Sequence, residues 1–166
     1  GAILRQNNIV LTCSFPDQHR HDGPHDDRAA LAEDLAVSGG ASAGYRVFQM
    51  PVESPNHGGR TMELAPEDPL ASPFGWHDVD GVPGAEFTIT RGNNVWATED
   101  LDDDDTPGYA PDGGATLAFD FPLDLNADPG GSLDASITNL FFWNNLMHDV
   151  WYQYGFDEQS GNFQEN

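Results

Sequence analysis

The stretch DASITNLFFWNNLMHDVWYQY, residues 134–154, predicts one long helix near the C-terminal end of the chain. Asp134 or Ser132 is placed to cap its first turn, and Gly155 is placed to end it. Its large apolar side chains form a continuous stripe when successive residues are set 100° apart, as in a helix. The stripe consists of Leu140, Trp143, Met147, Val150 and Tyr154, with Ile137, Phe141 and Trp151 at its edges.

The polar residues of this segment divide into two sets. Asn144 and His148 fall inside the apolar arc, four residues apart, and each needs a hydrogen-bond partner there. The opposite face, which we expect to be exposed, holds Thr138, Asn145, Asp149 and Gln153. A helix with so wide an apolar stripe must be covered on most of its circumference. We therefore expect one side to pack on a sheet and another to face a partner outside this chain.

Ahead of the helix, the sequence is typical of β-structure. Residues 45–50 predict a strand that Pro51 ends, because proline cannot donate a hydrogen bond to a neighbouring strand. Residues 86–90 alternate polar and apolar side chains, and together with residues 95–98 they predict a hairpin. Its turn is Gly92-Asn93-Asn94, since glycine and asparagine tolerate positive φ.

A last strand is predicted over residues 115–123, where apolar residues alternate with polar ones. Long loops rich in proline, glycine and aspartate connect these segments, and loops of this length are usually functional or stabilised by ions. The sequence therefore predicts an α+β fold: a β-rich N-terminal subdomain with antiparallel strands and long loops, carrying one long C-terminal helix.

Charge excludes two classes of partner. The chain has 28 acidic residues against six arginines and no lysine, a net charge of −22. Nucleic acid and anionic membrane surfaces both require basic patches, so neither is an expected partner. No apolar run approaches the roughly 18 residues of a membrane span. Such a surface suits an extracellular protein, solvated directly or with bound Ca²⁺ offsetting its carboxylates.

Residues 1–44 differ in composition from the rest and are interpreted as an N-terminal arm or a propeptide junction. They contain the single cysteine, Cys13, so no disulfide can form within the chain. They also contain His19, His21 and His25 among aspartates, which are metal-ligand types at close spacing. Because no rigid element frames them, an incidental chelating run is the favoured interpretation over a specific site.

An acidic loop is the other candidate ion site. Asp102, Asp103, Asp104 and Asp105 follow Glu99 and Asp100, which places six carboxylates within seven residues. Ca²⁺ takes six to eight oxygen ligands from loops of this kind. The spacing is not that of an EF-hand, so a solvated acidic turn is the alternative.

Several catalytic patterns are absent from the sequence. It contains no H-E-x-x-H, no H-x-x-E-H, no P-loop and no G-x-S-x-G. His148 lacks a second histidine one helical turn further on, and two imidazoles at that spacing are needed to hold zinc from one helix. Neither His77 nor His148 has a neighbouring serine or cysteine that would suggest a triad. We expect His148 to be a hydrogen-bonded core histidine, and no catalytic or cofactor-binding residue is assigned.

Long phrases of the sequence are too specific to be a matter of composition. These are SPFGWHDVDGVPGAEFTITRGNNVWATED (72–100), PDGGATLAFDFPLDL (111–125) and ITNLFFWNNLMHDVWYQYGFDEQSGNFQEN (137–166). Together with residues 45–76 they closely resemble the N-terminal portion of mature fungalysins, a family of secreted zinc metalloendopeptidases. The resemblance runs continuously from about residue 45 to 166.

The resemblance implies that residues 45–166 are one subdomain of a two-subdomain, thermolysin-like peptidase. The partner is then a C-terminal half that carries H-E-x-x-H, whose glutamate activates water beside the zinc. Those residues would lie after Asn166, so the chain alone is expected to be inactive. The substrates implied are proteins or peptides, and the location is extracellular.

A different class of function remains as the alternative. The chain could be an autonomous, calcium-stabilised β-rich module for adhesion or carbohydrate binding. The helix distinguishes the two, because a free module would have to expose an apolar face of more than a few hundred Å², which monomers rarely do. We therefore favour the peptidase subdomain.

Overall fold

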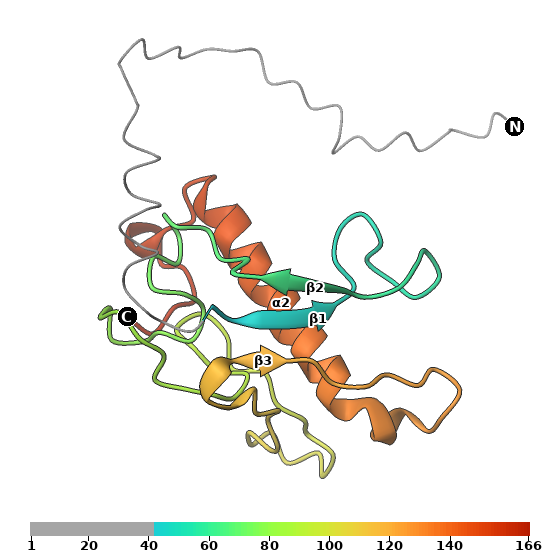
Figure 1. The fold of residues 1–166 in the computed structure, drawn as a ribbon. Coiled ribbons are helices and arrows are strands. Elements are labelled where there is room, and N and C mark those ends of the chain that lie inside the picture. Colours follow the sequence, from blue (N-terminus) through green and yellow to red (C-terminus); the bar gives the residue numbers. More distant parts are fainter. Residues whose placement is uncertain (1–41) are drawn as a thin grey trace, which may run out of the picture. The chain divides into compact units, whose positions relative to one another are not determined.

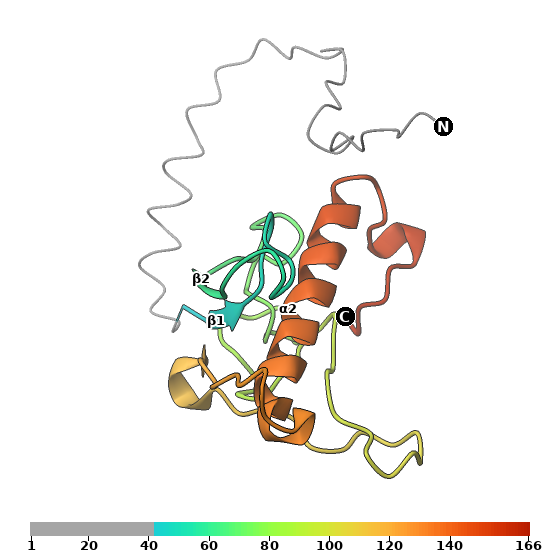
Figure 2. The ribbon, with the colours of Figure 1, turned by 90° about the vertical axis from the view of Figure 1, so that its right-hand side faces the viewer.

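The computed structural model describes residues 42–166, in which a small three-stranded sheet packs against one long helix (Figure 1). The strands are β1 (Gly44–Val47), β2 (Thr61–Leu64) and β3 (Ala118–Phe119), in the order β2-β1-β3. Helix α2 (Leu133–Tyr152) runs along one face of this sheet (Figure 2). Three single 3₁₀ turns complete the elements: η2 (Gly114–Thr116), η3 (Pro129–Ser132) and η4 (Glu158–Ser160). The predicted α+β class is confirmed.

The first predicted strand is confirmed in a shorter form. β1 ends at Val47 and alternates as a half-buried strand should, with Tyr45 and Val47 buried. Its antiparallel partner β2 was not expected, because Thr61–Leu64 carries no clear alternation. The other partner, β3, pairs with β1 in parallel, so the sheet is mixed, with the expected antiparallel pairing only between β1 and β2.

The hairpin predicted over residues 86–98 is present as a turn without regular strands. Only isolated bridges form there, Ile89 to Asp112 and Arg91 to Trp96. Gly92 is required by close approach, because a Cβ on it would lie 1.6 Å from the Trp76 carbonyl oxygen. The turn therefore packs into the body of the domain, and positive φ is not the reason for its glycine.

Residues 115–123 show the predicted alternation of burial in part, but only two of them form a strand. Leu117 and Phe119 are buried as expected, yet Leu117 has a φ of 51° at the end of η2. This left-handed residue breaks the extended backbone, which leaves the two-residue strand β3.

The core of the described region is aromatic. Tyr45, Trp76, Phe119, Phe141 and Phe142 are each at most 3% exposed. Their rings stack or meet edge to face, with Tyr45 in contact with the other four at centroid distances of 5.3–6.2 Å. This cluster fixes the helix to the sheet, because Phe141 and Phe142 come from α2 and Tyr45 from β1.

The phase predicted for the helix is wrong. The side of α2 that faces the domain buries Ile137, Thr138, Phe141, Phe142, Asn145 and Asp149, of which three were assigned to the exposed polar face. Most of the predicted apolar stripe is exposed: Leu140, Met147, Val150, Trp151 and Tyr154. Trp143 is half-buried and donates from Nε1 to the Phe48 carbonyl at 2.8 Å. Gln153 is exposed as expected.

Both termini of α2 lie close to the positions that the sequence predicted. Ser132 is the N-cap residue but makes no side-chain cap; its hydroxyl accepts a hydrogen bond from the Asp124 amide at 3.2 Å. Gly155 follows the last turn with a φ of +88°, which suits a residue that ends a helix.

Within the described residues, no helix is long and apolar enough to cross a membrane. Cys13 and the histidines His19, His21 and His25 lie outside the described residues, as does most of the arm predicted over residues 1–44.

Candidate functional site

One face of α2 is both apolar and exposed. We call Leu140, Met147, Val150, Trp151 and Tyr154 the open helix face; their exposed fractions range from 43% to 68%. Leu140, Met147, Val150 and Trp151 share one side of the helix, opposite the buried side that contains Phe142 and Asp149. Tyr154 lies in the turn two residues after the helix ends. Five large apolar side chains in one row are more than the scattered single residues that a monomer surface normally shows.

A cavity of about 330 Å³ lies beside the open helix face. Met147 and Trp151 belong to its wall as well as to that face. The rest of the lining is Asn94, Val95, Asn144, His148, Phe156 and Phe163. The lining is largely apolar with a few polar groups, which is the composition of a site that accepts a side chain of another molecule or segment.

Asp149 holds the helix from its buried side. The carboxylate is 3% exposed and accepts hydrogen bonds from Ser72 Oγ at 2.7 Å and from Trp76 Nε1 at 2.8 Å. The backbone amide of Asp68 donates to the same group at 2.9 Å. These donors come from the loop 68–76, so the network ties that loop to α2 and compensates for burying a charge.

His148 is hydrogen-bonded through both ring nitrogens, as expected. Nδ1 lies 3.0 Å from Asp149 Oδ1, and Nε2 lies 3.2 Å from Gln164 Oε1. Its side chain is 8% exposed and lines the cavity beside the open helix face. The contacts connect α2 to the C-terminal segment.

His77 is a second buried histidine. Its ring stacks on Phe119 and Phe141, with Nε2 2.8 Å from the Tyr45 hydroxyl and Nδ1 3.0 Å from the Arg91 carbonyl. Burial lowers the pKa of His77 to about 4, so the ring is neutral at physiological pH. Its hydrogen bonds go to a tyrosine and a backbone carbonyl, which makes it part of the core.

The structure brings only some of the carboxylates of the acidic loop 99–105 close to one another. Asp102 and Asp104 join Asp100 in a group whose oxygens lie within 4.8 Å of one another, and all three are exposed. Asp103 and Asp105 do not belong to this group and have φ angles of 56° and 59°. The calcium site predicted at Asp102–Asp105 stays a prediction.

Sequence reasoning missed a second acidic group, formed by Asp78, Asp80 and Glu86. Its signal is the run Asp78-Val79-Asp80-Gly81, with two carboxylates two residues apart in a loop with glycine.

Neither group suits zinc. The two groups found among residues 42–166 consist of carboxylates alone, whereas structural and catalytic zinc sites use histidine or cysteine ligands. Neither acidic group among these residues is therefore a candidate zinc site.

Comparison with known proteins decides the family. The profile of the fungalysin metallopeptidases matches residues 44–166, which is most of the chain. The chain belongs to the fungalysin family.

Individual fungalysin relatives agree. An extracellular metalloproteinase of Aspergillus flavus is 41% identical over 127 residues, which cover 75% of this chain and 19% of the relative. A probable extracellular metalloproteinase 5 of Arthroderma benhamiae is 39% identical, with the same coverage. The chain therefore spans about a fifth of the length of the curated relatives that it matches.

Proposed function

We propose that this chain is the N-terminal portion of a secreted, zinc-dependent metalloendopeptidase that hydrolyses peptide bonds in proteins. Membership of the fungalysin family supports the reaction class, and the relatives named above are extracellular metalloproteinases. Their greater length supports a further, zinc-bearing part beyond this chain. Residues 45–166 then form one subdomain, and residues 1–44 form an N-terminal arm or a propeptide junction.

The observation that carries the proposal is the open helix face. Its five large apolar side chains lie at 43–68% exposure, four of them on the helix whose other side is fixed in the core and the fifth, Tyr154, in the turn that follows. Covering such a row against another subdomain removes its apolar surface from water, at a gain of roughly 25 cal/mol per Å². The cavity lined by Met147 and Trp151 adds a recess that a side chain of the zinc-bearing part can enter.

The contribution of this chain to catalysis is then to present that helix. The aromatic cluster and the Asp149 network fix α2 from behind, so the open helix face is held in one orientation. When zinc is bound by the other part, it supplies the Lewis acid and the activated water of the family chemistry. Rigid support of the zinc-bearing part favours catalysis, because small displacements of reacting groups slow the reaction.

The alternative, an autonomous adhesion or carbohydrate-binding module, has less support. It requires the open helix face to remain in water, and it leaves the match over residues 44–166 to a peptidase family without an explanation.

Substitutions on the open helix face test the proposal in two settings. We expect Val150→Ser with Trp151→Ser to change the melting temperature of the 166-residue chain little, because both side chains are already exposed. In the longer polypeptide of the same reading frame, the same pair should lower the melting temperature by roughly 5 °C or more, since buried apolar contacts are lost.

Leu101→Ser with Leu125→Ser is the matched control. Both leucines are more than 60% exposed and lie outside the open helix face, so this pair should have a small effect in either polypeptide. An equally small effect of the Val150 and Trp151 substitutions in the longer polypeptide would contradict the proposed docking.

A further inference from the structure

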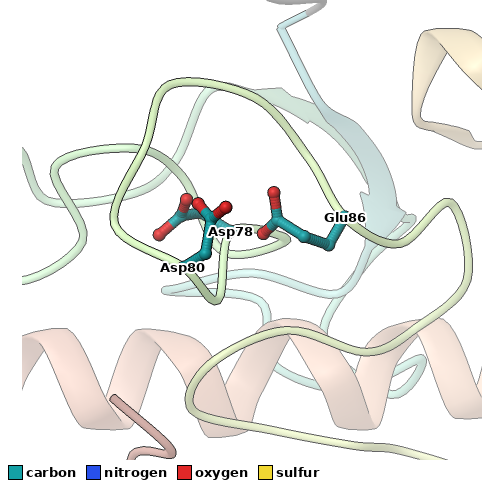
Figure 3. A group of neighbouring side chains, drawn as sticks. All are labelled: Asp78, Asp80 and Glu86. Carbon is teal, nitrogen blue, oxygen red and sulfur yellow. The ribbon is translucent and has the colours of Figure 1, made fainter.

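Three carboxylates converge in the loop that follows Trp76 and His77. Asp78, Asp80 and Glu86 each offer one oxygen, and these oxygens lie within 4.8 Å of one another. Figure 3 shows the carboxyl groups of Asp78 and Asp80 side by side, with the Glu86 side chain extending toward them. Asp78 is 7% exposed, whereas Asp80 and Glu86 are on the surface. The group thus combines one buried carboxylate with two exposed ones.

The loop backbone already uses one oxygen of each carboxylate. The Gly81 amide donates to Asp78 Oδ2 at 3.2 Å, the Val82 amide to Asp80 Oδ1 at 2.9 Å, and the Val79 amide to Glu86 Oε2. These bonds hold the three side chains in place and leave their second oxygens available. A set of ligands fixed in this way has lost its flexibility before any ion binds.

The second carboxylate oxygen of Asp78 indicates that a ligand binds here. Asp78 Oδ1 is buried and has no hydrogen-bond partner among the described residues. Leaving a buried charged acceptor unpaired costs more than the about 1–3 kcal/mol of a neutral group. The pKa of Asp78 is correspondingly raised, by burial first and then by the neighbouring charges of Glu86 and Asp80.

No arginine of the described region neutralises this group. Arg46 pairs with Asp120, Arg91 is 3.5 Å from Glu165, and Arg60 donates to the backbone carbonyls of Arg46 and Phe121. None of the ion pairs found among residues 42–166 includes Asp78, Asp80 or Glu86. Among residues 42–166, no basic side chain therefore supplies the compensating charge.

We propose that Asp78, Asp80 and Glu86 bind one Ca²⁺ ion, with Asp78 Oδ1 as the buried ligand. The ligands are all carboxylate oxygens, which suit a hard cation. Zinc sites, by contrast, use the nitrogen of histidine or the sulfur of cysteine. Ca²⁺ fits better than Mg²⁺, because it accepts irregular loop geometry and several carboxylates, whereas Mg²⁺ demands a near-ideal octahedron and keeps its waters.

The ion would stabilise more than its own loop. The Asp78 carbonyl accepts from the Asn93 amide at 3.0 Å, and the Val79 carbonyl accepts from Asn166 Nδ2 at 3.0 Å. The loop 78–86 thus joins the turn at Gly92 to the C-terminal segment. Fixing it with a cation fixes both of these neighbours, so calcium supports the region that adjoins the cavity beside the open helix face.

The second acidic group lacks the feature that carries this proposal. Asp100, Asp102 and Asp104 are all exposed. Asp104 Oδ1 accepts from the amide and hydroxyl of Thr106, and Asp100 Oδ1 accepts from the Asp104 amide. All of their oxygens can be hydrated by water, so this group provides a control of equal charge.

Calcium titration of the 166-residue chain, after removal of divalent ions, tests the proposal. Calorimetry with CaCl₂ should show one ion bound with a dissociation constant below about 1 mM, the range of extracellular calcium modules. The double substitution Asp80→Asn with Glu86→Gln should weaken this binding at least tenfold, and should remove most of the rise in melting temperature that millimolar Ca²⁺ causes. Both positions are exposed, so the fold should persist.

Asp102→Asn with Asp104→Asn changes charge by the same amount and should keep the binding and the melting response. Asp78→Asn, as a third variant, should also abolish binding, with its fold checked by near-ultraviolet circular dichroism. The proposal is wrong if the unsubstituted chain, freed of divalent ions, binds no Ca²⁺ at 10-fold the expected dissociation constant, about 10 mM. It is also wrong if the Asp102 and Asp104 pair loses the response while the Asp80 and Glu86 pair keeps it.

Discussion

Asp149→Ala should lower the free energy of unfolding of the chain by at least about 3 kcal/mol, because it removes the acceptor of several buried donors. Ser72 Oγ and Trp76 Nε1 are both buried and both donate to this carboxylate, and the Asp68 amide joins them. Without Asp149 these buried donors lose their acceptor. Urea unfolding at neutral pH, followed by tryptophan fluorescence, measures the change.

Two variants bracket this result. Asp149→Asn retains one acceptor oxygen with nearly the same shape, so it should cost less than the alanine variant. Gln153→Ala, one turn further on at an exposed position, removes only the bond to Asp68 Oδ1 and should change stability by no more than about 0.5 kcal/mol. Equal and small effects at Asp149 and Gln153 would show that the network contributes nothing to the fold.

Phe141→Ala should cost about 3–5 kcal/mol, the usual loss for removing a fully buried phenylalanine. Its side chain is 0% exposed, and its ring contacts those of Tyr45, Trp76, His77 and Phe119. A domain with a typical stability of about 5–15 kcal/mol would lose a large share of it. The same urea titration, with unfolding midpoints compared at constant slope, provides the measurement.

The neighbouring Leu140→Ala is the control for this prediction. Leu140 is 49% exposed and lies on the open helix face, so its truncation should cost less than about 1 kcal/mol in the chain alone. A larger loss at Leu140 than at Phe141 would restore the helical phase that the sequence suggested and contradict the structure.

The helix shows how far the sequence could be interpreted. Its position was predictable within two residues, because helical periodicity, Ser132 and Gly155 all agree. Its orientation was not, because the prediction assigned the most apolar side to the core. Asn145 and Asp149 are buried because distant loop residues hydrogen-bond to them, and Asn94 and Ser72 are far away in sequence. The apolar side is exposed because nothing in the described part of the chain covers it.

The strands show a different limit. Alternation over residues 115–123 correctly put Leu117 and Phe119 on one face, which is buried, since it depends only on a period of two. It overestimated regular pairing around Ile89 and Trp96, where Thr90 Oγ1 donates to the Ala97 carbonyl at 2.7 Å in place of a longer ladder. A side-chain hydrogen bond that takes the place of backbone pairing leaves no periodic pattern in the sequence.

The candidate sites were predictable in type and only partly in place. Acidic loops were the expected ion ligands, and the structure does gather carboxylates into two such groups. The sequence favoured the longest run, Asp102–Asp105, because composition emphasises charge density. The burial of Asp78, which distinguishes the other group, arises from tertiary packing and cannot be predicted from residue spacing.

The central claim is that this chain is a non-catalytic portion of a fungalysin peptidase, and hydrolysis of casein tests it most directly. The assay compares the purified 166-residue chain with the longer polypeptide of the same reading frame, each with zinc and with a zinc chelator. We expect no hydrolysis by the chain alone, no stoichiometric zinc bound to it, and chelator-sensitive hydrolysis by the longer polypeptide. Chelator-sensitive hydrolysis by the 166-residue chain alone would contradict the account.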